Sequence, residues 1–237
     1  MPFLREKLTS NLSYISLSII SLFPVIIFLG SGILNFSIIL LDILFISEIL
    51  LKKNFKYFNN KFFYSFIFCW LILLINLNFS ISFYDSLPRS LGFLRFIFFV
   101  FAINYYLFET SNKYVNLIFK FWTIVFVIIS VDLIYEYFVG VNTLGFKSYM
   151  PGRLSGFFNQ ELKIGHLYSA FILICLSSIY LYLKDLKFKK ANLSFDFIKN
   201  NIFYLILILF LFISIIIGER SNFIKTFIMT IMFLFIF

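Results

Sequence analysis

A succession of eight long apolar runs, separated by short polar or glycine-containing segments, dominates this 237-residue sequence. Each run approaches the roughly 20 residues that a helix needs to cross the hydrocarbon core of a bilayer, for which about 17 is a lower limit. We therefore predict a membrane-spanning helix over each of the following ranges: Tyr14–Leu29, Ile33–Leu51, Phe62–Leu77, Ser90–Phe108, Val115–Val139, Ile164–Leu183, Ile202–Ile217 and Asn222–Phe237.

The composition supports a membrane protein. Hydrophobic residues make up 62% of the chain, whereas soluble domains are close to half apolar. A single soluble core cannot bury this much apolar side chain, so the bilayer must act as the solvent for most of it. The expected fold is an all-α transmembrane bundle of about eight spans that forms a single domain over residues 1–237.

The charged residues predict an orientation. The formal net charge is +9, which in a membrane protein is first explained by basic cytoplasmic loops, and not by a nucleic-acid partner. If the N-terminus lies in the cytoplasm, most lysines fall on the cytoplasmic side. With eight spans, the C-terminus lies on that side as well. Every arginine except Arg5 then lies outside, which indicates that the outer face uses guanidinium groups.

Two outer segments combine arginine with glycine just before a predicted helix. "GRLSG" lies in the longest outer loop, residues 140–163, and "GERSN" opens the last helix. Arginine donates paired hydrogen bonds to phosphate oxygens, glycine lets the backbone approach an anion, and a helix N-terminus favours negative charge. We expect Arg153 and Arg220 to bind one lipid-linked diphosphate.

The two segments resemble motifs of the O-antigen ligase and O-antigen polymerase superfamily. Its pattern is R-x-x-G, then Asp or Asn, then a glycine that opens the next helix, and later an outer G-x-R-[ST] turn. The residues that fit this pattern are Arg153, Gly156, Asn159, Gly165, Gly218, Arg220 and Ser221.

The resemblance implies a glycosyltransferase of the bacterial inner membrane. Such an enzyme transfers a glycan from undecaprenyl diphosphate to lipid A–core, or to a growing polysaccharide, at the periplasmic face. The arginines would hold the diphosphate leaving group, so no metal or cofactor is expected. The family's catalytic histidine lies in a later periplasmic loop, which would follow Phe237; because the sequence stops inside an apolar run, we expect further segments beyond it.

Other polar residues admit two interpretations each. Arg153 could be a solvated loop charge, and Arg220 an interfacial anchor paired with Glu219. Arg89 and Arg95, which flank Gly92, could support the site or extend towards the membrane surface. His166, the only histidine, suits a general base, but its position in the first helical turn also fits an interfacial residue.

The acidic residues within the predicted helices carry the main alternative. Asp132 and Glu136 lie four residues apart on one helix face. They could bind a coupling ion or a proton, as intramembrane acids of transporters do, or they could be buried partners of Arg95. Asp42 and Glu48 have the same ambiguity. A transporter or flippase for a lipid-linked or anionic solute therefore remains the rival function, and an inactive fragment is a third possibility. The two cysteines, Cys69 and Cys175, suggest neither a disulfide nor a metal site.

Overall fold

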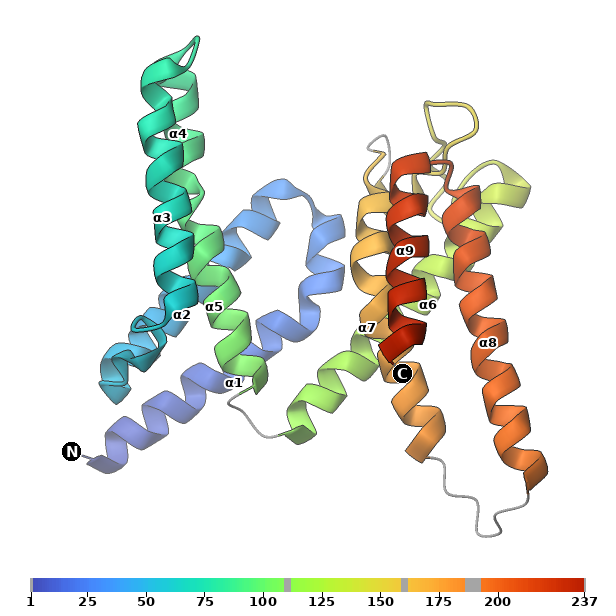
Figure 1. Ribbon diagram of the computed structural model, residues 1–237, viewed down its shortest axis with the longest axis horizontal. Coiled ribbons are helices and arrows are strands. Elements are labelled where there is room, and N and C mark those ends of the chain that lie inside the picture. Colours follow the sequence, from blue (N-terminus) through green and yellow to red (C-terminus); the bar gives the residue numbers. More distant parts are fainter. Residues whose placement is uncertain (1, 109–111, 159–161, 186–192, 237) are drawn as a thin grey trace. The chain divides into compact units, whose positions relative to one another are not determined.

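The computed structural model describes residues 2–108, 112–158, 162–185 and 193–236, and over these ranges the chain is all helical (Figure 1). Helices account for 85% of it, and the described residues contain no strand. The predicted all-α class is therefore confirmed. The chain divides into two compact units, residues 1–115 and 116–237, which are described separately below.

The first unit contains five complete helices and the beginning of α6. They are α1 (Pro2–Ile26), α2 (Ser31–Lys52), α3 (Lys61–Asn76), α4 (Phe83–Gly92) and α5 (Leu94–Phe108). Helix α2 packs against α1 and α5, and α3 packs against α4 and α5. Gly30, with a φ of 105°, lies at the sharp turn between α1 and α2.

A buried carboxylate joins three helices of this unit. Glu48 of α2 is fully buried and accepts hydrogen bonds from the hydroxyls of Ser13, Tyr105 and Tyr106, at 2.8, 2.9 and 3.0 Å. It also pairs with Lys52 at 2.6 Å. These contacts give Glu48 a structural role, since a buried charge is tolerated when it is paired and hydrogen-bonded.

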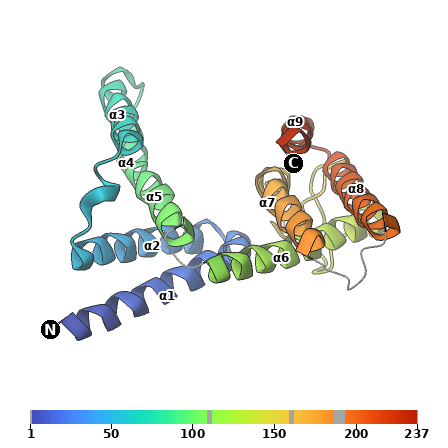
Figure 2. The ribbon, with the colours of Figure 1, turned by 60° about the horizontal axis from the view of Figure 1, so that its bottom comes forward.

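The second unit is built from α6 (Asn112–Val139), α7 (Ile164–Asp185), α8 (Leu193–Ile216) and α9 (Arg220–Ile236). Helices α7, α8 and α9 pack pairwise and lie side by side in Figures 1 and 2. Helix α6 packs against α7 and α8 through aromatic side chains. The ring centroid of Phe126 lies 4.5 Å from that of Tyr168 on α7 and 5.1 Å from that of Phe210 on α8.

Each predicted apolar run overlaps a helix over most of its described length, but the fourth run crosses from α4 into α5. The fourth run is predicted to begin at Ser90, whereas helix α4 already begins at Phe83 and is followed by α5. Asp85, Pro88 and Arg89 make this helix polar, so it carries no apolar signal in the sequence.

In the part of the chain that the structure describes, six helices are long and apolar enough to cross a membrane, so the chain is a membrane protein. They cover Leu8–Leu29, Ser31–Lys52, Lys61–Phe79, Phe83–Phe108, Tyr114–Val139 and Ile164–Lys184. The predicted count of eight is not confirmed, because the apolar part of α8, Asn201–Ile216, and the 17-residue helix α9 are both shorter than these six helices.

Candidate anion-binding cavity

The loop between α6 and α7 is fixed to α6 by a buried carboxylate. Glu136 is 2% exposed. Its Oε1 accepts hydrogen bonds from the backbone N–H and the hydroxyl of Ser155, at 3.0 and 3.2 Å, and its Oε2 accepts one from the N–H of Gly156 at 2.8 Å. The segment next to Arg153 is therefore anchored by both oxygens of one side chain.

A second acid and an amide order the earlier part of the same loop. Asp132 Oδ1 accepts hydrogen bonds from the backbone N–H of Thr143 at 2.9 Å and from its hydroxyl at 2.6 Å. The Asn142 amide donates to the carbonyl of Gly156 at 2.6 Å, while its oxygen accepts from the N–H of Phe146 at 2.7 Å. One turn of α6 thus holds the loop at two places, near its beginning at Thr143 and further along at Ser155 and Gly156.

The loop meets the turn between α8 and α9 through close backbone contacts. The N–H of Leu154 donates to the carbonyl of Ile217 at 3.2 Å. Gly218 has a φ of +83°, and a Cβ at this position would lie 2.2 Å from the carbonyl oxygen of Gly152. Only glycine fits here, because both the left-handed backbone and the missing side chain are needed.

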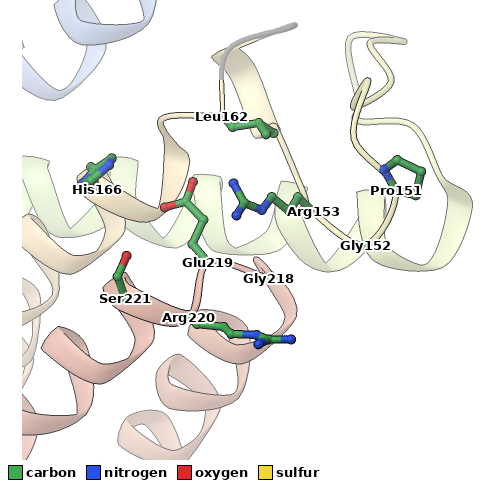
Figure 3. Close-up of a pocket in the computed structure, with 9 residues that line it drawn as sticks. All are labelled: Pro151, Gly152, Arg153, Leu162, His166, Gly218, Glu219, Arg220 and Ser221. Atoms are coloured by element: carbon green, nitrogen blue, oxygen red, sulfur yellow. The ribbon is translucent and has the colours of Figure 1, made fainter.

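A cavity of about 580 Å³ lies where the loop, the turn and the beginning of α7 meet (Figure 3). Both predicted diphosphate-binding arginines line it, although they are far apart in the sequence. The lining residues are Pro151, Gly152, Arg153, Leu162, His166, Gly218, Glu219, Arg220 and Ser221. A smaller hollow of about 290 Å³ also includes Arg153 and contains Lys147.

The two arginines approach the cavity differently. Arg153 is half-buried, and Figure 3 shows its guanidinium directed towards the carboxylate of Glu219. Arg220 is exposed, and its guanidinium lies on the other side of the turn, near Gly218. Because Arg220 is exposed, its side chain can turn towards a bound anion without disturbing packed neighbours.

Gly165 explains how Glu219 reaches the cavity. A Cβ on Gly165 would lie 2.3 Å from Glu219 Oε2 and 3.0 Å from the amide nitrogen of Asn222. The Asn222 amide donates a hydrogen bond to this Oε2. The bare backbone of α7 therefore makes room for a Glu219–Asn222 pair at the beginning of α9.

The structure brings together only part of the predicted set. Arg153, Arg220, Gly218 and Ser221 line the cavity, whereas Gly156 and Gly165 shape its surroundings by close packing. Gly156 has a φ of +52°, and a Cβ there would lie 3.3 Å from the side chain of Ile164. Asn159 lies outside the described residues.

Arg89 and Arg95, the predicted supporting arginines, belong to the first unit. Arg89 is exposed on α4. The guanidinium of Arg95 lies 4.8 Å from the ring centre of Phe96, and its Nε is buried without a hydrogen-bond partner.

The alternatives for the acidic residues can be compared with these contacts. The hydrogen bonds of Asp132 and Glu136 go to the loop residues Thr143, Ser155 and Gly156. The structure shows no ion pair between the described residues Glu219 and Arg220, so the alternative in which these two side chains pair receives no support.

Glu219 and Asn222 are site residues that the sequence reasoning missed as a pair. Glu219 is 7% exposed, and Asn222 is 3% exposed. Their signal was their position: both flank Arg220 within "GERSN", and the spacing of three residues puts them on one face of a helix. The contact with Gly165 could not be foreseen, because it joins two helices.

Among the described residues, no group of three or more His, Cys, Asp or Glu side chains lies close enough together to hold a metal ion. Comparisons with protein-family models, curated proteins and solved structures found no match to this chain.

Proposed function

We propose that this chain is a membrane glycosyltransferase that acts on an undecaprenyl-diphosphate-linked glycan, as O-antigen ligases and polymerases do. The observation that carries the proposal is the shared cavity of Arg153 and Arg220. Each arginine comes from a motif chosen in the sequence for its resemblance to that superfamily. The shared lining lets one anionic ligand contact both side chains once Arg220 turns towards the cavity.

The chemistry of the cavity suits a diphosphate leaving group. In the proposed reaction, the bond between the anomeric carbon and the diphosphate oxygen breaks, and an acceptor hydroxyl bonds to that carbon and releases its proton to water. Negative charge develops on the diphosphate as it leaves. Guanidinium groups that are already in place stabilise this charge, so the reaction needs no metal in this account.

The acceptor and the membrane side belong to the same proposal. Lipid A–core and a growing polysaccharide both present hydroxyl groups, and either could be the acceptor. We place the cavity at the periplasmic face of the bacterial inner membrane, because this orientation puts most lysines in the cytoplasm.

The transporter receives less support from the acidic residues. That hypothesis needs Asp132 and Glu136 to bind a coupling ion or solute. Three oxygens of these two carboxylates instead accept hydrogen bonds from the loop.

Release of undecaprenyl diphosphate tests the proposal. Membranes containing the chain are given an undecaprenyl-diphosphate-linked glycan, and the freed lipid diphosphate is measured. We expect Arg153→Ala and Arg220→Ala each to lower the rate by about 100-fold or more, as removal of one charge-stabilising group does. The control is Lys225→Ala, an exposed cation on the same helix outside the cavity. Equal rates for the arginine variants and the unchanged chain would refute the proposal.

A further inference from the structure

Glu219 is an unusual residue for a cavity that binds an anion. Its side chain is more than nine-tenths buried, and among the described residues that line the cavity it is the one carboxylate. A carboxylate repels phosphate oxygens, so a site made only for a bare diphosphate gains nothing from it.

One oxygen of this carboxylate has no protein partner. Glu219 Oε2 accepts the hydrogen bond from the Asn222 amide, whereas Oε1 is buried and forms no hydrogen bond. Leaving a buried acceptor unsatisfied costs free energy that a donor from a ligand can recover. Figure 3 shows the carboxylate turned towards the space between His166 and Arg153.

The surrounding contacts fix the carboxylate in this position. The Asn222 amide holds Oε2, and the bare backbone of Gly165 lies against the same oxygen, so the other oxygen is the one left for a ligand. A carboxylate oxygen accepts hydrogen bonds but cannot donate them when ionised. The group that it needs is therefore a hydroxyl or an N–H.

We infer that Glu219 selects a glycosylated phosphate over a bare one. Its Oε1 accepts a hydrogen bond from a sugar hydroxyl, while the phosphate groups of the same ligand lie against Arg153 and Arg220. The carboxylate favours the glycosylated ligand by accepting a hydrogen bond from its sugar hydroxyl. It disfavours a phosphate that carries no sugar, because it repels the phosphate oxygens. This inference rests on the proposed function and names the part of the ligand next to the diphosphate.

Affinities for two probes test the inference. The full chain in detergent is titrated with farnesyl diphosphate and with farnesyl diphosphate carrying one glucose. We expect the unchanged chain to prefer the glucose-bearing probe by about tenfold, the size of one hydrogen bond to a charged group. Glu219→Gln should lose most of this preference and bind farnesyl diphosphate at least as tightly as before. Lys225→Gln, the control, should keep the preference.

The outcomes separate the two proposals. If Glu219→Gln keeps the full preference for glucose, the inference is overturned while diphosphate binding stands. If the unchanged chain binds neither probe, the proposed function fails and the inference fails with it. Should Glu219→Gln not fold, carbodiimide labelling of the unchanged chain replaces it. The glucose-bearing probe should then protect Glu219 better than farnesyl diphosphate does, and equal protection would overturn the inference.

Discussion

Two glycines with the same φ angle show how closely the loop and the turn approach each other beside the cavity. Gly145 and Gly218 both have a φ of +83°, but a Cβ on Gly145 would meet nothing within 4 Å. A Cβ on Gly218 would meet the carbonyl oxygen of Gly152 at 2.2 Å. An alanine at either position would therefore have the same strained φ, but only at Gly218 would its Cβ also clash with a neighbouring backbone atom.

Alanine substitution at these positions should separate strain from contact. Gly145→Ala is expected to cost about 1–2 kcal/mol of folding free energy, from the left-handed backbone alone. Gly218→Ala should cost roughly 1–3 kcal/mol more, because two backbone segments must move apart. Thermal unfolding of the purified chain measures both. Equal shifts in the unfolding temperature would show that the loop and the turn are not in contact.

At the scale of elements, helix α6 organises the site through its two acids. Glu136 uses both carboxylate oxygens for the loop, whereas the hydrogen bonds to Asp132 all reach Oδ1. An amide can replace one accepting oxygen but not two, because its other end is a donor.

Amide substitutions should therefore affect the loop unequally. Glu136→Gln leaves either Ser155 or Gly156 facing an N–H₂ group, at a cost of about 1–3 kcal/mol. Asp132→Asn can keep the accepting oxygen at Thr143 and should cost less. Hydrogen exchange of the loop amides is the measurement. We expect faster exchange at Ser155 and Gly156 in the first variant, and a larger effect in the second variant would contradict this role of Glu136.

The sequence predicted helices well and contacts between helices poorly, for physical reasons. Length and apolar composition locate a helix in a bilayer, so each predicted run overlaps helical residues over most of its described length. The beginning of helix α4 was not predicted, because Asp85, Pro88 and Arg89 make this helix polar. The arginine motifs were visible locally, but the contact of Gly165 with Glu219 depends on how two helices pack, and no local pattern encodes it.

At the scale of the whole molecule, the proposed topology puts the loop and the turn on one side of the membrane. Residues of both segments line one cavity of the second unit. The exposed residue Tyr182 lies near the other end of α7, a helix long and apolar enough to cross a bilayer.

Single cysteines test this topology. In a chain with Cys69 and Cys175 replaced by serine, Lys147→Cys and Ser221→Cys should react with a membrane-impermeant maleimide added outside intact spheroplasts. Tyr182→Cys should react only after the membrane is opened. Labelling of Lys147→Cys and Ser221→Cys from opposite sides would be incompatible with a shared cavity.

The central claim is that Arg153 and Arg220 form one binding site for a lipid diphosphate. The most direct measurement is the affinity of the detergent-solubilised chain for undecaprenyl diphosphate, compared with Arg153→Ala, Arg220→Ala and the Lys225→Ala control. We predict that each arginine variant binds at least about tenfold more weakly, since charge-assisted contacts of this kind are worth about 1.5–3 kcal/mol, and that the control is unchanged. Unaltered affinity in either arginine variant would contradict the claim.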